Sequence, residues 1–141
     1  SNANVLKNIN RFTVNNDEQY KIIKKLKKSG IYVKSMFMFG NPEDSVETIK
    51  KTIEYSKFLP NQLVQFSVFT PYPGTPAYDE FKNKIVVHKF EKYNQYNLVY
   101  NHKSLNEDIL IKLKNFGYRK FYFNIKNFFI IFLSCASFFR K

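Results

Sequence analysis

Two short loops hold the residue types that could form a binding site. Gly40-Asn41-Pro42-Glu43 and Thr70 to Pro76 (TPYPGTP) each follow an apolar run. A glycine such as Gly40 allows a ligand to approach the backbone closely, and the Glu43 carboxylate could accept a hydrogen bond or balance a charge. Prolines fix φ and remove backbone donors, so the second loop should be stiff. The loops therefore predict a ligand site, although proline-rich turns and strand-ending glycines also occur without any function.

The elements around these loops predict a parallel α/β arrangement. We expect helices over about 17–29 and 44–60, strands over 31–39 and 63–70, and a third helix that Thr75 caps with Pro76 at its first position. Strands that are apolar nearly throughout and alternate with helices favour a parallel sheet covered by helices. Both loops should then lie at the carboxyl edge of that sheet, where α/β proteins bind ligands.

Helix starts follow from pairs of capping residues three positions apart. A capping residue and its partner satisfy backbone N–H groups at a helix start. The expected capping pairs are Asn16 with Gln19, Asp44 with Glu47, and Ser104 with Glu107.

Beyond residue 81 the predicted secondary structure is coarser. Segments 84–90 and 97–100 are short strands or loop, Gly117 ends or interrupts a helix, and 118–141 forms a further aromatic helix.

Composition bounds the class of protein. The 141 residues suit one domain, and residues 1–3 are typical of an expression-tag remnant. The formal charge of +12 favours acidic partners, namely nucleic acid, an anionic membrane or phosphorylated substrates, although an AT-rich genome would also enrich lysine. Cys135 is the only cysteine, which excludes an internal disulfide and fits the cytoplasm. The sequence contains no run of about 18 apolar residues, which is the length that would predict a membrane-spanning helix.

Five segments, in order along the chain, resemble radical S-adenosylmethionine enzymes. The resemblance is to the subgroup that often carries an upstream cobalamin-binding domain, which includes anaerobic magnesium-protoporphyrin monomethyl ester cyclase-like Fe–S oxidoreductases. The fourth of these segments, which contains PYPGTP directly after a predicted strand, is the most specific part of the pattern. The matching segments are 5–11, 30–31, 39–43, 69–76 and 118–122.

The resemblance implies a fold and a set of cofactor-binding residues. The fold would be α/β, the later half of a partial (β/α) barrel with parallel strands, spanning 4–103 and followed by a helical basic aromatic tail over 104–141. The two predicted strands would be the fifth and sixth of six. The family pattern G-x-I-x-G-x-x-E aligns with residues 36–43, so the resemblance implies adenosylmethionine-binding roles for Met36, Met38, Gly40 and Glu43, with Met36 replacing the first glycine.

The second loop would form a wall of the same site. By the same resemblance, this wall beside the adenosyl group or the substrate comprises Pro71, Tyr72, Pro73, Gly74 and Thr75. The family also needs a 4Fe–4S cluster, which three closely spaced cysteines hold, and this chain has one cysteine. The resemblance thus implies S-adenosylmethionine, a 4Fe–4S cluster and, in some members, cobalamin in the parent protein, with none bound to this chain.

We therefore expect a carboxy-terminal fragment of such an enzyme, or a degenerate relative, that is inert alone. Its partner would be the missing amino-terminal part of the barrel. A half-barrel exposes a strand edge and apolar surface, so the isolated chain should form homo-oligomers. No catalytic residue and no metal ligand is expected in this chain. His88 and His102 lack ligand spacing, and the acidic pairs 43–44 and 79–80 begin helices, where the dipole favours negative charge.

An alternative function is a non-catalytic basic α/β module. Lysine and arginine alternate with phenylalanine and tyrosine from Tyr118 to Lys141. This tail could lie on an anionic membrane surface, such as the inner face of the cytoplasmic membrane, or, as the less favoured reading, contact nucleic acid. It could equally pack across the barrel bottom or against a missing domain.

Overall fold

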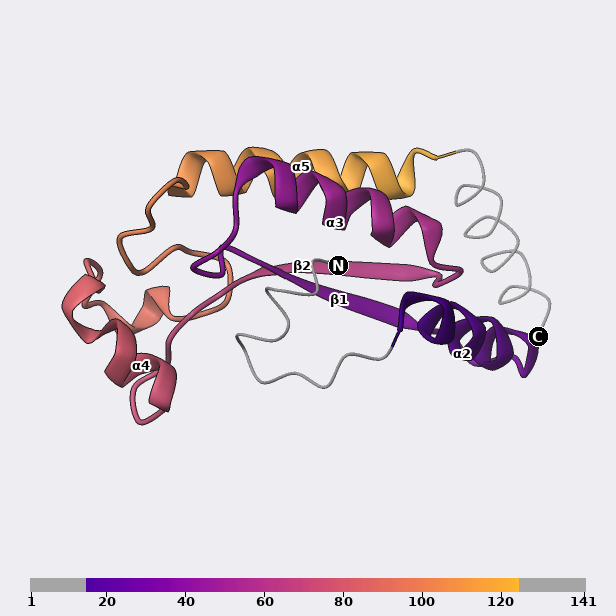
Figure 1. Cartoon of the computed structure of the whole chain (residues 1–141), viewed down its shortest axis with the longest axis horizontal. Coiled ribbons are helices and arrows are strands. Elements are labelled where there is room, and N and C mark those ends of the chain that lie inside the picture. Colours follow the sequence, from indigo (N-terminus) through magenta and orange to yellow (C-terminus); the bar gives the residue numbers. More distant parts are fainter. Residues whose placement is uncertain (1–14, 125–141) are drawn as a thin grey trace.

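The computed structural model describes residues 15–124, which form an α/β unit (Figure 1). The segments 5–11 and 125–141, including Cys135, lie outside the described residues. Two short 3₁₀ helices, η1 (Lys82–Lys84) and η2 (Phe90–Lys92), follow the fourth helix. The main elements are α2 (Asn16–Lys28), β1 (Lys34–Phe39), α3 (Val46–Phe58), β2 (Leu63–Val68), α4 (Pro76–Phe81) and α5 (Glu107–Tyr122).

The two strands pair in parallel, as the sequence predicts. Their register runs from Lys34 opposite Leu63 to Phe39 opposite Val68, and α3 connects them. In Figure 1, α3 and α5 lie along the same face of this sheet. The core between the sheet and these helices includes Phe39, Phe66, Ile49, Ile53 and Leu110, each at most 1% exposed.

The other face of β1 is open, so the prediction of a strand buried on both faces is wrong for β1. Side chains alternate between exposed and more buried positions along Lys34–Phe39. Met36 is 56% exposed and Met38 is 47% exposed. The physical reason is that the helices of the described part cover one face of the sheet, and side chains of a strand alternate between its two faces.

Two helix starts lie near the predicted caps but use different residues. Asn15, and not Asn16, caps α2 by accepting a hydrogen bond from the backbone N–H of Asp17. At α3 the capping box is Ser45 with Thr48, because the Asp44 carboxylate instead accepts bonds from the Asn41 N–H and the Thr48 hydroxyl. In both cases the cap is the direct neighbour of the predicted residue, and at α3 the other bonds of Asp44 explain the difference.

The start of α5 shows the same competition, whereas α4 begins at the predicted cap. Asn106 caps α5, whereas the predicted cap Ser104 donates its hydroxyl to the Asp44 carbonyl. The Thr75 cap of α4 is confirmed, with Pro76 in the first turn. The segments 84–90 and 97–100 form loop with a single antiparallel bridge between Ile85 and Tyr100.

Gly117 lies inside α5, which continues through it to Tyr122. A Cβ atom built on Gly117 would lie 2.8 Å from Cε2 of Phe66. The glycine therefore lets α5 pack closely on β2, and it neither ends nor interrupts the helix.

Tyrosine hydroxyls from α5 close the outer edge of β2. The Phe66 N–H donates to the Tyr118 hydroxyl (3.2 Å), and the Val64 N–H donates to the Tyr122 hydroxyl (3.3 Å), which itself donates to the Val64 carbonyl. The Val68 N–H donates to the Gln95 carbonyl at 2.7 Å. Because β1 and β2 form a two-stranded sheet, the outer edge of β1 has no strand partner within residues 15–124.

Candidate binding site at the carboxyl ends of the strands

The loops after β1 and β2 leave the same edge of the sheet. The Phe69 N–H donates to the Phe39 carbonyl at 2.8 Å, and this hydrogen bond connects the two segments directly after the strands end. Gly40 and Gly74 begin and shape these loops with φ values of +75° and +82°, in the region that favours glycine. The predicted placement of both loops at one edge is therefore confirmed.

The first loop is a tight turn held by Asp44. The Asp44 carboxylate accepts hydrogen bonds from the Asn41 backbone N–H (2.9 Å) and the Asn41 side-chain amide (3.2 Å). The Asp44 N–H in turn donates to the Asn41 carbonyl at 2.8 Å. Asn41 is 4% exposed and Asp44 is 6% exposed, so these groups form a buried polar turn directly after β1.

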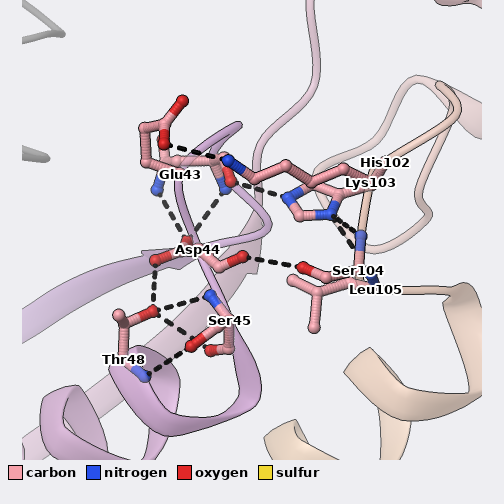
Figure 2. Close-up of polar contacts among 9 residues, drawn as sticks. Glu43, Asp44, Ser45, Thr48, His102, Lys103, Ser104 and Leu105 are labelled. Atoms are coloured by element: carbon pink, nitrogen blue, oxygen red, sulfur yellow. Dashed lines mark hydrogen bonds and ion pairs between the residues drawn. The ribbon is translucent and has the colours of Figure 1, made fainter.

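His102 fastens this turn to the segment before α5 (Figure 2). Its Nε2 lies 2.8 Å from the Asn41 carbonyl, and its Nδ1 accepts bonds from the N–H groups of Ser104 and Leu105. A carbonyl can only accept and a backbone N–H can only donate, so these contacts assign the donor role to Nε2 and the acceptor role to Nδ1. No sequence pattern identifies Asn41 as the partner of His102, because the two residues are 61 positions apart.

Tyr100 holds the same turn from another side. Its hydroxyl donates to the Gly40 carbonyl at 2.6 Å, and the tyrosine is 2% exposed. Burial, followed by the nearby Asp44 carboxylate, raises the pKa of Tyr100 above its usual range. The phenol therefore stays protonated and remains a donor over the whole ordinary pH range.

Gly40 is buried, and its surroundings are packed. A Cβ atom on it would lie 3.3 Å from Leu110 Cδ1 and 3.6 Å from Val68 Cγ1. The glycine is thus needed for close packing of α5 on the strand end as well as for its positive φ.

The other residues that the resemblance assigned to adenosylmethionine lie on two surfaces. Met36 and Met38 are on the open face of β1. Glu43 is exposed and forms an ion pair with Lys103, with 3.0 Å between the Lys103 Nζ and a Glu43 carboxylate oxygen. An exposed pair of this kind contributes little to stability.

A pocket of about 370 Å³ lies beside the first loop. Two lysines and one glutamate give it mixed charge, and Phe81 and Val86 add apolar surface. Most of the residues that line the pocket come from segments 81–86 and 100–103, for which no sequence pattern predicted a binding role. The pocket is also lined by Pro42, Glu43, Lys84, Tyr100, His102 and Lys103.

The second loop lies at the same edge but does not line this pocket. Pro71 is buried, whereas Tyr72, Pro73 and Gly74 are exposed. The Thr75 hydroxyl donates to the Tyr72 carbonyl at 2.6 Å and accepts from the Tyr78 N–H, which ties the loop to α4. The predicted stiffness thus has a structural cause, while the wall role of the loop stays a prediction.

Within residues 15–124, no group of three or more histidine, cysteine, aspartate or glutamate side chains could hold a metal ion. In the same part of the chain, no helix is long and apolar enough to cross a bilayer.

Comparison with known proteins shows similarity to methyltransferases and a cyclase. The chain is 34% identical over 93 residues to bacteriochlorophyllide d C-8(2)-methyltransferase and 28% identical over 111 residues to bacteriochlorophyllide d C-12(1)-methyltransferase, both of Chlorobaculum tepidum. It is 27% identical over 105 residues to the anaerobic magnesium-protoporphyrin IX monomethyl ester cyclase of Cereibacter sphaeroides. No model of a protein family and no solved structure matches the chain.

These matches cover most of this chain but a small part of each relative. They include 64%, 79% and 74% of the chain, respectively, and 21%, 24% and 17% of the relatives. The chain therefore spans about a fifth of the length of the curated relatives it matches. Over that segment, the comparisons support the resemblance of this chain to radical S-adenosylmethionine enzymes.

Proposed function

We propose that this chain forms the last two strands of the barrel of a radical S-adenosylmethionine Fe–S oxidoreductase and helps to bind S-adenosylmethionine. The observation that carries the proposal is the parallel β1–β2 pair, whose two glycine-containing loops leave one edge of the sheet. The similarity to anaerobic cyclases and methyltransferases along the same segment supports it.

The residues at this edge fit S-adenosylmethionine chemically. Met36 and Met38 offer exposed apolar surface on the open face of β1, against which an adenine ring could pack. The side-chain oxygen Oδ1 of Asn41 is buried and has no hydrogen-bond partner among the described residues, so it is an acceptor that the ligand could use. Burying a polar atom without a partner is costly, which favours a role for it in binding.

The residues of this chain do not fit a 4Fe–4S cluster. Such a cluster needs several thiolates, and Cys135 is the only cysteine. The cluster, and with it the cleavage of S-adenosylmethionine, would belong to the upstream part of a longer enzyme, and this chain alone would be inert. A cobalamin, as carried by members of the subgroup, would likewise be held by an upstream domain.

The partner of this chain would be the earlier part of the barrel. The outer edge of β2 is closed by Tyr118 and Tyr122, whereas the edge of β1 is open. Earlier strands would pair with the open edge of β1. The relatives are named for acting on bacteriochlorophyllide d and magnesium-protoporphyrin IX monomethyl ester, so we propose a tetrapyrrole-like substrate for the longer enzyme.

A titration with S-adenosylmethionine tests this proposal. The chain alone should show no calorimetric signal, and the chain joined to the upstream, three-cysteine part of a matched relative should bind. Met38→Ser in the joined protein should weaken binding about tenfold, because one apolar contact of the adenine is lost. Ile22→Ser is the matched control, since Ile22 on α2 is also 47% exposed. Equal affinities of the two variants would refute the assignment of the site.

A further inference from the structure

A groove between the last turns of α3 and α5 combines basic and aromatic side chains. It has a volume of about 540 Å³ and is lined by Lys57, Phe116, Arg119, Lys120, Phe123 and Asn124. Both helices run opposite to the strands in Figure 1, so the groove lies at the other end of the sheet from the loops after β1 and β2. It is therefore separate from the proposed adenosylmethionine site.

The lining of the groove carries positive charge and no acidic residue. Glu54 pairs with Lys57, with 2.6 Å between the Lys57 Nζ and a Glu54 oxygen, and it offsets one of the three cations. The acidic residues of α5, Glu107 and Asp108, lie in its first turn, at the far end of the helix. Helix dipoles favour cations at these carboxyl ends, but they do not explain the aromatic surface between them.

Phe123 is the main apolar feature of the groove. It is 83% exposed, although the transfer of a phenyl ring out of water is strongly favourable. Its N–H donates to the Arg119 carbonyl at 2.9 Å, which fixes the backbone of Phe123 directly after α5. Beside it, the Lys120 ammonium lies 5.5 Å from the centre of the Phe116 ring. Exposed rings flanked by cations suit the boundary between lipid head groups and acyl chains.

We propose that this groove binds the head groups of anionic phospholipids and holds the protein at a membrane surface. Lys57, Arg119 and Lys120 would contact the phosphates, and Phe123 would enter the acyl boundary. The charge of the groove argues against two other occupants. Residues 125–141 carry Lys126, Arg140 and Lys141 with no acidic residue, and a second copy of this chain also has a charge of +12. Neither would neutralise the groove.

Vesicle flotation tests the proposal. The full chain should float with vesicles of equal parts phosphatidylcholine and phosphatidylglycerol and stay behind with phosphatidylcholine alone. Lys57→Gln/Arg119→Gln/Lys120→Gln should lower the partition coefficient about a hundredfold, because each basic side chain at an anionic surface contributes about fivefold. The control Lys21→Gln/Lys25→Gln/Lys28→Gln removes the same charge from exposed positions of α2 and should cause a much smaller loss.

A second variant separates the apolar contribution from charge. Phe123→Ser leaves the charge unchanged and should lower binding to the mixed vesicles severalfold, without affecting the folding of so exposed a position. Equal losses in the groove triple and the α2 triple would overturn the proposal, since net charge alone would then explain binding. A groove triple that loses affinity for a single-stranded oligonucleotide, but not for vesicles, would also overturn it and identify nucleic acid as the partner. Either result leaves the adenosylmethionine titration untouched.

Discussion

At the scale of single residues, two side chains from one short segment fix the turn after β1. The Tyr100 hydroxyl donates to the Gly40 carbonyl, and the His102 ring bonds the Asn41 carbonyl on the next residue. Both acceptors are backbone carbonyls of the turn, so these two bonds add to those that Asp44 makes with Asn41. A ligand at this edge would thus meet a turn that is already ordered, which lowers the entropic cost of binding.

The raised pKa of Tyr100 gives the protein a specific alkaline instability. Burial and the Asp44 charge disfavour the phenolate in the folded state. The stabilisation is complete below the unfolded tyrosine pKa of about 10, and it is lost as pH rises from there towards the higher folded pKa. Thermal unfolding at neutral pH and near pH 11 should show a large fall in Tm for the wild type.

The Tm of Tyr100→Phe should fall less than that of the wild type over the same pH range, although the variant has a lower Tm at neutral pH. The lower start reflects the lost bond to the buried Gly40 carbonyl, about 1–3 kcal/mol. Tyr96→Phe, at a tyrosine that is 54% exposed, is the control and should keep the wild-type pH profile. A Tyr100→Phe profile parallel to the wild type would contradict this explanation.

The sequence could predict the loops of this site but not the contacts that hold them. Gly40 and the proline-rich loop are marked by local chemistry, since positive φ and fixed φ belong to particular residue types. The roles of Tyr100 and His102 depend on partners about 60 residues away, and no local periodicity encodes such pairs. The one local signal is a histidine in a polar segment just before a helix, and this signal does not identify the carbonyl that the histidine binds.

At the scale of elements, the order of helices and strands was predictable and their exact starts were not. Apolar runs and breakers such as Pro60 specify where α3 and β2 belong. At the starts of α2, α3 and α5, however, a polar residue near the predicted one serves as the cap. Asp44 and Ser104 failed as caps because their groups are used elsewhere in the loop network, which Figure 2 shows.

Gly117 illustrates how packing between elements overrides helix propensity. Gly117→Ala should favour the helix by about 1 kcal/mol. The new methyl group, however, would meet the Phe66 ring at 2.8 Å. That ring is fully buried, is stacked on Phe39 and contacts Tyr118 edge-on, so it has little room to move. Overpacking of this kind costs about 1–3 kcal/mol, and we expect a net loss of stability in urea unfolding.

Asn115→Ala is the matched control for Gly117→Ala. Asn115 is an exposed position of the same helix, where alanine brings its propensity without a packing penalty. This variant should be slightly more stable than the wild type, by about 0.5 kcal/mol. If Gly117→Ala were also stabilised, α5 could move away from β2, and the close approach would not be required.

At the scale of the whole molecule, one face and one edge of the sheet are covered, whereas the other face and the other edge are not. Helices α3 and α5 cover one face (Figure 1), and tyrosine hydroxyls close the edge of β2. The face with Met36 and Met38 and the outer edge of β1 remain open within the described residues. An unpaired strand edge and exposed apolar side chains are typical sites of association, so we expect this open side to bind a partner.

We expect the isolated chain to self-associate through this open side. In sedimentation velocity runs, the average mass should rise with protein concentration, because strand edges and apolar faces are the usual sites of such pairing. Met36→Lys/Met38→Lys should shift the chain towards monomer, since charges on this face block close approach. Ile22→Lys/Ile111→Lys adds the same charge at exposed apolar positions of α2 and α5 and should leave association unchanged. A monomer at every concentration would mean that the open face of β1 is not an interface, and the proposed docking of earlier barrel strands would then lose its main physical support.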